Sequence, residues 1–319
     1  METLGLHHIT AITSDAEKIY EFMTQVLGLR LAKKTVNQDD IHTYHLFFTD
    51  ALASPGTDLT FFDFQGIQKR QTGTNSIQTI GLRVPSHEAL SYFKQRFDSF
   101  NVSYQSIETL HDMTYLPFQD FDGQHYALYS DEGVPGVAGG KPWDQTDIPI
   151  EYAIIGLGPI ELRVNNLSGM HGVMTSYMGF ELIYSEQKTK VYETHLGGNG
   201  ARVIVREDLT SPARQGYGGV HHVAFGVKED QDIHDWIDHL NQIPARHSGY
   251  VDRFYFHSLY TRLYPGILFE FATLGPGFVD DEESLDTLGS TLALPPKLRP
   301  HRNQIEAMIR PIHTGGKSR

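Results

Sequence analysis

The feature that most constrains this fold is an internal repeat, in which a strand-like segment, an amphipathic helix and several further strand-like segments recur in the same order. In the first copy, HHITAIT at 7–13 precedes apolar residues at helical spacing, and strand-like runs follow, ending at 59–64. The order restarts near residues 79, 159 and 220. The chain therefore predicts four βαβββ modules of about sixty residues each.

A single module of this kind leaves one face of its sheet uncovered, so modules have to pair. We predict an α+β fold in which four modules pair into two open, cup-shaped barrels. The N-terminal half, 1–135, would hold two modules and the C-terminal half, 151–275, the other two. The first two modules are expected at 1–75 and 76–135, and the Gly/Pro-rich linker at 136–150. The other two modules are expected at 151–215 and 216–275, and the surface tail at 276–319.

Two of the four modules carry an adjacent pair of histidines at the same position of their first strand. These strands align as HHITAIT, QTIGLRV, GPIELRV and HHVAFGV, so His8 and His222 are equivalent, and Thr79 and Pro159 stand in their place elsewhere. Because side chains alternate between the faces of a strand, only one histidine of each pair points into the cup. We expect His8 and His222 to share one site.

Glu270 is an isolated carboxylate in the apolar run ILFEFAT. Alignment of DGQHYALYS in module two with PGILFEFAT in module four places Ala127 at the equivalent position. Burial of a carboxylate among apolar side chains is costly unless a cation or strong donors compensate. His8, His222 and Glu270 therefore predict a metal site of the two-histidine, one-carboxylate type found with non-haem Fe(II), which leaves coordination positions open.

This ligand set also predicts how the modules pair. One ion needs all three donors within about 2.0–2.2 Å. Module one therefore has to face module four, and modules two and three would form a second cup without ligands. The remaining histidines, among them His45 and His125, are expected to have structural roles.

Three residues beside the ligands are candidates for roles in catalysis. Thr10 shares the face of His8, and its hydroxyl could orient a ligand or bound oxygen, although threonine is also common in strands. His7 and His221 are candidate partners of the ligand imidazoles or proton shuttles near neutral pH. An ordinary histidine at the rim of the cup is the alternative for each.

The segment just upstream of Glu270 adds Arg253, His257 and Tyr260. Tyr260 could donate a hydrogen bond to a phenolate, and Arg253 could hold an anionic intermediate. We include His257 among the candidate residues near the substrate. Aromatic lining of the cup is the alternative for Tyr260, and a surface salt bridge is the alternative for Arg253.

Composition excludes several other functions. With 39 acidic and 26 basic residues the net charge is −13, so nucleic acid and anionic membrane surfaces would be repelled. The absence of cysteine removes disulfides, thiolate nucleophiles and cysteine-ligated zinc. The beginning of the chain lacks a signal-peptide pattern and no apolar stretch reaches the length of a membrane span, so we expect a cytoplasmic protein. A homo-oligomer is left open.

LHHITAIT at 6–13, GGVHHVAFGV at 218–227 and PGILFEFAT at 265–273 resemble ring-cleaving dioxygenases of the glyoxalase/bleomycin-resistance/extradiol dioxygenase (vicinal oxygen chelate) superfamily, above all the hydroquinone dioxygenases. The likeness covers about 1–310. It implies Fe(II), with Mn(II) as the alternative ion, bound by His8, His222 and Glu270, with O₂ as co-substrate. It also implies that the chain opens the ring of a small aromatic para-diol, in aromatic-compound degradation or quinone detoxification. The resemblance further implies supporting roles for His7, Thr10, His221, Arg253 and Tyr260, the last two on their spacing to Glu270.

Three alternatives remain at this point. A catechol-type extradiol dioxygenase uses the same ligand types but draws them from the C-terminal pair of modules, whereas His8 lies in module one. A glyoxalase-like isomerase characteristically has four protein ligands, and the sequence offers three. A metal-free binding or resistance protein would have no need of Glu270.

Overall fold

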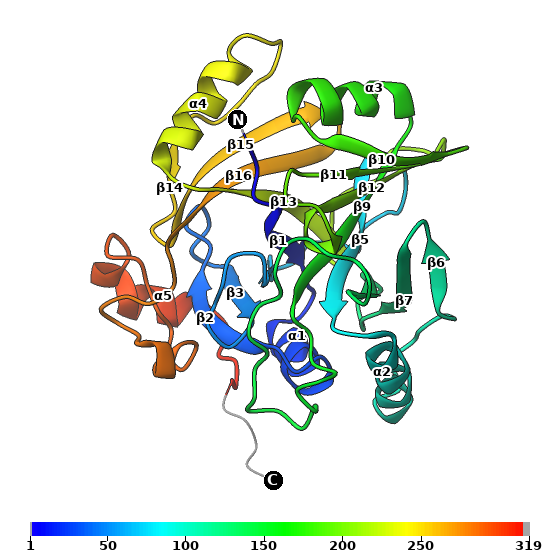
Figure 1. Ribbon diagram of the computed structural model, residues 1–319. Coiled ribbons are helices and arrows are strands. Elements are labelled where there is room, and N and C mark those ends of the chain that lie inside the picture. The colour runs from blue at the N-terminus through cyan, green and yellow to red at the C-terminus, as the bar shows by residue number, and fades with distance from the viewer. Residues whose placement is uncertain (1, 315–319) are drawn as a thin grey trace.

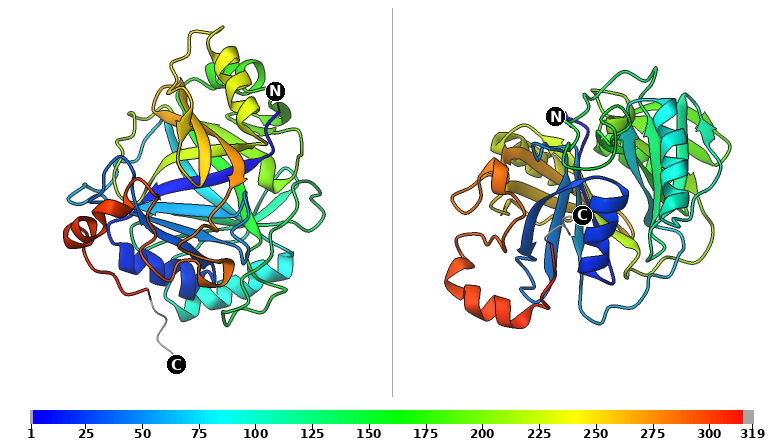
Figure 2. Two further views of the ribbon diagram at one scale, coloured as in Figure 1. Left: turned by 90° about the vertical axis from the view of Figure 1, so that its left-hand side faces the viewer. Right: turned by 90° about the horizontal axis from the view of Figure 1, so that it is seen from below.

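The computed structural model describes residues 2–314, in which the strands form two curled sheets of eight strands each. The strands of modules one and four, blue and gold, make the first sheet. Those of modules two and three, cyan and green, make the second sheet, which lies beside the first in Figure 2 (right). The predicted α+β class, with module one facing module four, is confirmed. Of the predicted tail, residues 315–319 lie outside the described residues.

The first sheet joins the beginning of the chain to its C-terminal third. Its strands, in spatial order, are β14 (Val251–Asp252), β15 (Phe256–Tyr264), β16 (Ile267–Pro276), β13 (Gly219–Val227), β1 (Leu6–Ile12), β4 (Asp58–Phe62), β3 (Tyr44–Thr49) and β2 (Arg30–Val36).

The second sheet has the same plan. Its strands, in spatial order, are β10 (Glu181–Glu186), β11 (Thr189–Glu193), β12 (Arg202–Glu207), β9 (Gly156–Val164), β5 (Ser76–Val84), β8 (His125–Ser130), β7 (Met113–Gln119) and β6 (Glu108–Leu110).

Each sheet is centred on an antiparallel pair formed by the first strands of its two modules, β1 with β13 and β5 with β9. The last strand of each module lies parallel to its first strand, as in β13 with β16, where Ala224 faces Glu270. The position of Glu270 is occupied in the other modules by Thr60, Ala127 and Ile204, because each is paired with the equivalent residue of its own first strand. Only one of the four equivalent positions therefore carries a carboxylate.

One helical segment follows the first strand of each module, and its apolar side packs on the sheet. Helix α1 (Ala16–Glu21) and helix α3 (Leu167–Gly172) each continue into a π-helical turn, at Phe22–Val26 and Val173–Tyr177. The longer helices are α2 (His87–Ser99) and α4 (Asp230–Leu240). In α4 the buried Trp236 stacks on Phe271 of β16, with ring centroids 4.0 Å apart. The helical spacing read from the sequence thus corresponds to core contacts.

The tail after β16 docks on the outer edge of the first sheet. It contains two 3₁₀ turns, Leu285–Thr287 and Arg299–His301, and helix α5 (Arg302–Met308). The backbone N–H of Ala293 donates to the carbonyl of Lys34 in β2 at 2.9 Å. The Lys33 ammonium is fully buried and lies 2.8 Å from Glu283 of the tail. The tail therefore covers an edge strand that would otherwise expose unpaired backbone groups.

None of the helices in residues 2–314 has both the length and the apolar character that crossing a bilayer requires.

Candidate metal centre

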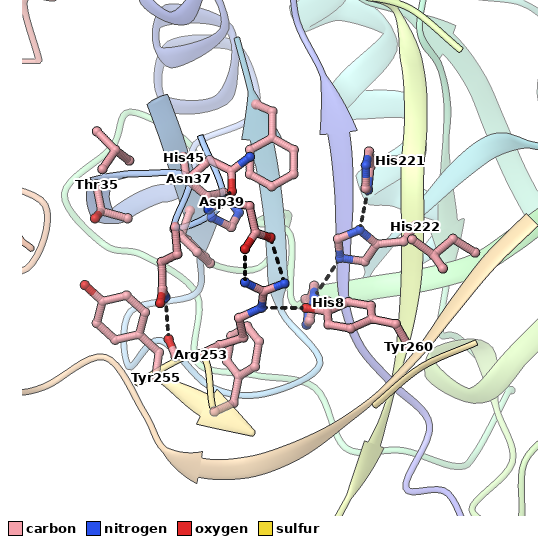
Figure 3. Close-up of a pocket in the computed structure, with 16 residues that line it drawn as sticks. His8, Thr35, Asn37, Asp39, His45, His221, His222, Arg253, Tyr255 and Tyr260 are labelled. Atoms are coloured by element: carbon pink, nitrogen blue, oxygen red, sulfur yellow. Dashed lines mark hydrogen bonds and ion pairs between the residues drawn. The ribbon is translucent and has the colours of Figure 1, made fainter. Parts of the chain in front are cut away.

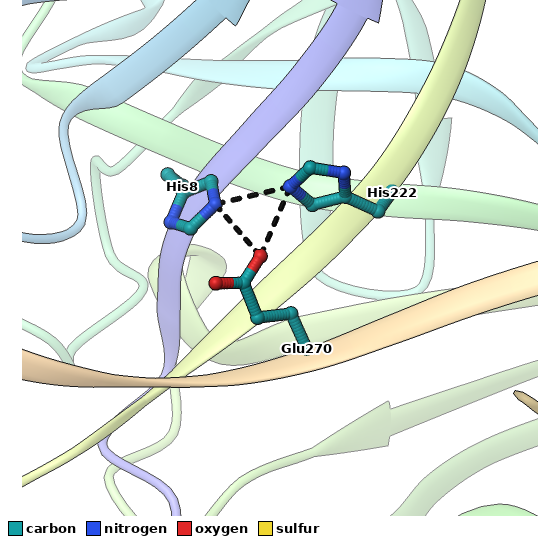
Figure 4. Close-up of side chains that lie close together, drawn as sticks. All are labelled: His8, His222 and Glu270. Carbon is teal, nitrogen blue, oxygen red and sulfur yellow. Dashed lines mark hydrogen bonds and ion pairs between the residues drawn. The ribbon is translucent and has the colours of Figure 1, made fainter. Parts of the chain in front are cut away.

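Three side chains from neighbouring strands of the first sheet converge in its interior (Figure 4). His8 comes from β1, His222 from β13 and Glu270 from β16. Glu270 Oε2 lies 3.0 Å from Nε2 of each histidine, and the two Nε2 atoms are 3.2 Å apart. All three side chains are buried. Cis ligands on an octahedral ion with bonds of about 2.1 Å are about 3.0 Å apart, so the spacing fits three ligands on one face of such an ion.

One oxygen of the Glu270 carboxylate accepts a hydrogen bond, and the other has no hydrogen-bond partner. The hydroxyl of Ser258 in β15 donates to Glu270 Oε1 at 2.6 Å. Oε2 is buried and accepts no hydrogen bond of good geometry, although two imidazoles point at it. Burial raises the pKa of Glu270, but the facing His8 and His222 outweigh burial and hold that pKa well below its usual range. An ionised, unsatisfied oxygen between two imidazole nitrogens fits a divalent cation.

Hydrogen bonds behind His8 determine which of its nitrogens can bind a metal. His7 Nε2 lies 3.0 Å from the carbonyl of Thr273, which only accepts, so His7 carries its proton on Nε2. His7 Nδ1 is then the acceptor for His8 Nδ1–H, 2.9 Å away. The lone pair of His8 therefore lies on Nε2, which faces Glu270. Burial lowers the pKa of His7 to about 3, in keeping with a neutral ring.

His221 is the neighbour of His222 as His7 is the neighbour of His8, but it forms fewer hydrogen bonds. His222 Nδ1 lies 2.8 Å from Nδ1 of His221, so donation from His222 leaves the proton of His221 on Nε2. In contrast to His7, His221 is half-buried and its Nε2 has no hydrogen-bond partner among the described residues. Thr10 Oγ1 lies 2.9 Å from His222 Nε2 and 2.8 Å from the hydroxyl of Thr60. Its hydroxyl thus lies directly beside the metal position.

The candidate ligands His8 and His222 face a cavity of about 330 Å³ (Figure 3). Apolar and aromatic side chains form much of its wall, while Arg253 and Tyr260 reach in from the C-terminal module. Arg253 Nε donates to the Tyr260 hydroxyl at 3.2 Å, and its guanidinium pairs with Asp39 at 2.9 Å. Burial and the nearby Glu270 raise the pKa of Tyr260, so its phenol keeps its proton. A polar molecule in this cavity would meet a phenol donor backed by a cation.

The predicted site residues lie mostly where the sequence places them. His8, His222, His221, Arg253 and Tyr260 line the cavity. Glu270 lies at its base against the two ligand histidines, and His7 and Thr10 contact those histidines directly. His257 is the exception: it is paired with Asp230 of α4 outside the cavity. Its side chain lies on the opposite face of β15 from Ser258 and Tyr260, because successive side chains of a strand point to opposite faces.

Several cavity residues were missed by the sequence reasoning. His45, expected to be structural, lines the cavity beside Phe47 and lies 2.9 Å from Thr60 Oγ1. The alternation of His45 and Phe47 on one face of β3 is a signal that could have found them. Asp39 has no such signal, because it belongs to a loop and meets Arg253 only through the pairing of the first and last modules.

Asp58 is a further carboxyl that the sequence reasoning did not single out. It pairs with His8 across β1 and β4, is 1% exposed, and has no hydrogen-bond partner on either oxygen. Burial raises its pKa to about 7. It lies behind the ligand side of His8, facing a small space that His7 also borders.

Comparison with known proteins gives a consistent result. The glyoxalase/bleomycin resistance protein/dioxygenase superfamily pattern matches residues 5–128. The chain is 44% identical over 319 residues to "Putative ring-cleaving dioxygenase MhqA" of Bacillus subtilis, covering 98% of this chain and all of the relative. It is 28% identical over 316 residues to "Chlorohydroquinone/hydroquinone 1,2-dioxygenase" of Sphingobium indicum, covering 94% of both chains.

Solved structures agree. A crystal structure of a "putative dioxygenase" from Bacillus subtilis superimposes with a TM-score of 0.90 at 33% identity, over 99% of both chains. Glyoxalase I from Zea mays shares the fold, with a TM-score of 0.59 at 12% identity over 84% of this chain and 92% of that one. The chain belongs to the glyoxalase/bleomycin resistance protein/dioxygenase superfamily and, within it, to the family of ring-cleaving dioxygenases.

Proposed function

We propose that this chain is an Fe(II)-dependent dioxygenase that opens the ring of a hydroquinone-type para-diol. The observation that carries the proposal is the buried set of His8, His222 and Glu270, whose free side faces an aromatic-lined cavity. The relative from Sphingobium indicum is named for action on hydroquinones. Bound Fe(II), or Mn(II) in its place, would supply the redox-active Lewis acid on which diol and O₂ meet.

The side chains around the ligands have separate tasks in this reaction. Tyr260 donates its phenol hydrogen to the substrate oxygen, and Arg253, which donates to Tyr260, stabilises negative charge that develops there. His221 is half-buried, and its Nε2–H has no partner among the described residues, so it donates a hydrogen bond to an oxygen of the bound substrate. His7 keeps its proton on Nε2 against Thr273, so it positions His8 and does not carry protons. Phe47, with the other aromatic side chains, excludes water from the ring.

The ligand count argues against an isomerase of the glyoxalase type. The module-one counterpart of Glu270 is Thr60, whose hydroxyl is already engaged with Thr10 and His45. A fourth protein ligand is therefore missing at the position from which a symmetric pair of modules would supply it. Likewise, a metal-free binding protein would leave Glu270 Oε2 buried without compensation.

The test is oxygen uptake by protein loaded anaerobically with Fe(II), using hydroquinone, methylhydroquinone, chlorohydroquinone and catechol side by side. We expect stoichiometric uptake with the para-diols and about one iron per chain. Faster turnover of catechol would replace the para-diol assignment with a catechol-type one. Tightly bound zinc together with no oxygen uptake on any diol would refute the dioxygenase.

A further inference from the structure

A second cavity lies on the other side of His221, and its lining is cationic. It has a volume of about 220 Å³ and is bordered by Arg70, Arg214 and Arg262, with no aspartate or glutamate among its lining residues. His221 borders both this cavity and the one that holds the metal ligands. The chain has a net charge of −13, so three arginines around one cavity without carboxylates make the local charge opposite in sign to that of the whole protein.

These arginines have unused hydrogen-bonding capacity. Within residues 2–314, none of the three forms an ion pair with a carboxylate, in contrast to Arg83, Arg96 and others of the chain. Among the described residues, one side-chain hydrogen bond involves these arginines, from Arg70 to the carbonyl of Gly123 at 3.3 Å. Arg70 is half-buried, and burial lowers its pKa. Arg214 and Arg262 are exposed at the rim. Planar guanidinium groups in this state are suited to bind carboxylates.

The frame of this cavity is fixed by the two segments that connect the modules. Gln71 and Arg214 exchange two backbone hydrogen bonds of 3.0 Å, so the linker before module two is tied to the linker before module four. The approach is close enough to require glycine: a Cβ on Gly73 would lie 2.0 Å from the Ser211 carbonyl, and one on Gly216 would lie 2.2 Å from that of Gln68. Arg70 and Arg214 are therefore presented from a rigid junction, and Arg262 is presented from β15.

The proposed reaction makes an anion from a neutral substrate. Cleavage of the carbon–carbon bond beside a phenol carbon, with both atoms of O₂ entering the product, leaves one new end as a carboxylic acid and the other as an aldehyde. The acid loses its proton at neutral pH. The arginine cavity beyond His221, which has no carboxylate among its lining residues, attracts such a product.

We propose that the Arg70–Arg214–Arg262 cavity is a binding site for a small organic carboxylate, the ring-opened product of this enzyme. The inference rests on the proposed function for the identity of the ligand. The existence of the site stands on the cavity alone, so the two can fail separately.

The experiment is calorimetric titration of the metal-free protein with muconate, a six-carbon dicarboxylate that mimics a ring-opened diol. We expect one site per chain. The double variant R214Q/R262Q changes only exposed side chains, so it keeps the fold, and it should weaken binding by at least about tenfold because it removes two charge-assisted contacts. The matched control is R246Q, which removes an exposed arginine away from the cavity and should bind as the unmodified chain does.

Three results would overturn the site. They are absence of muconate binding, equal loss of affinity in R214Q/R262Q and R246Q, and equal affinity for inorganic phosphate, which would remove the preference for carboxylates. Because the titration needs no turnover, muconate binding by a protein that consumes no oxygen would refute the dioxygenase and retain the site. Oxygen uptake by a protein that does not bind muconate would retain the dioxygenase and refute the site.

Discussion

Substitution of Glu270 by glutamine is the sharpest test of the metal centre. Glutamine keeps the shape of the side chain and an acceptor for the Ser258 hydroxyl, which lies 2.6 Å from Oε1. It removes the negative charge that His8 and His222 face at 3.0 Å. Losing a group that only supports a ligand typically costs 10–100-fold in metal affinity, so loss of the ligand charge itself should cost at least about 100-fold.

The expected change in thermal stability follows from linkage. At a free Fe(II) concentration of about 100 times Kd, binding stabilises the folded state by about 2.7 kcal/mol. A 100-fold loss of affinity reduces this to RT ln 2, about 0.4 kcal/mol. With an unfolding entropy of about 2.1 cal/mol/K per residue, a chain of 319 residues shifts by about 1.5 °C per kcal/mol, so the Tm increase on adding Fe(II) should fall from roughly 4 °C to below about 1 °C.

The assay is an anaerobic thermal melt with and without Fe(II), together with metal content after gel filtration. The matched control is His125→Ala, a histidine of the second sheet that should bind iron as the unmodified chain does. If Glu270→Gln kept its iron, or if both variants lost iron equally, the assignment of the three ligands would be refuted.

Three further results are expected. His7→Phe should lower Fe(II) affinity about 10–100-fold, because His8 Nδ1 loses its acceptor, and an unchanged dissociation constant in a metal titration would contradict the hydrogen-bond chain. Lys33→Met should lower the free energy of unfolding in urea by about 3–5 kcal/mol, because it leaves the buried Glu283 without its partner. Adding Glu283→Gln should restore part of the lost free energy. No recovery would show that loss of the ion pair is not the cause. Burial, with two nearby arginines, lowers the pKa of His125 to about 4. The contribution of the neutral His125 ring to stability is therefore present above pH 6.5 and lost as pH falls toward 4. His125→Gln should flatten the decline of the unfolding free energy across this range. A decline parallel to that of the unmodified chain would disprove this role of His125.

Much of the candidate metal centre could be predicted from the sequence, because it depends on short-range rules. Alternation along a strand separates His7 from His8, and the repeat aligns His8 with His222. An isolated carboxylate in an apolar strand identifies Glu270. From these three residues alone, the requirement that one ion contact them all leads to the pairing of modules one and four, which the sheet order confirms.

The residues that escaped prediction depend on contacts between distant loops. Asp39 reaches Arg253 across the mouth of the cavity, and the two residues are 214 positions apart. The tail was expected at the surface, but its carboxylates reach Lys33 of β2, so it is part of the packing of an edge strand. His257 is a separate case: it was placed near the substrate by its neighbours in sequence, but alternation along β15 turns its side chain away from Tyr260, toward Asp230.

The sequence by itself determined the repeat, the module pairing and the cluster of His8, His222 and Glu270, because periodicity, equivalence of repeats and the cost of burying charge are properties of local segments. Only the tertiary structure decided the surroundings of His7 and His221. The two histidines occupy equivalent positions, yet His7 is held by the carbonyl of Thr273, while His221 lies between two cavities and its Nε2 has no partner within residues 2–314. Equivalent positions in a repeat diverge when their surroundings differ, and those surroundings come from parts of the chain that the repeat does not relate.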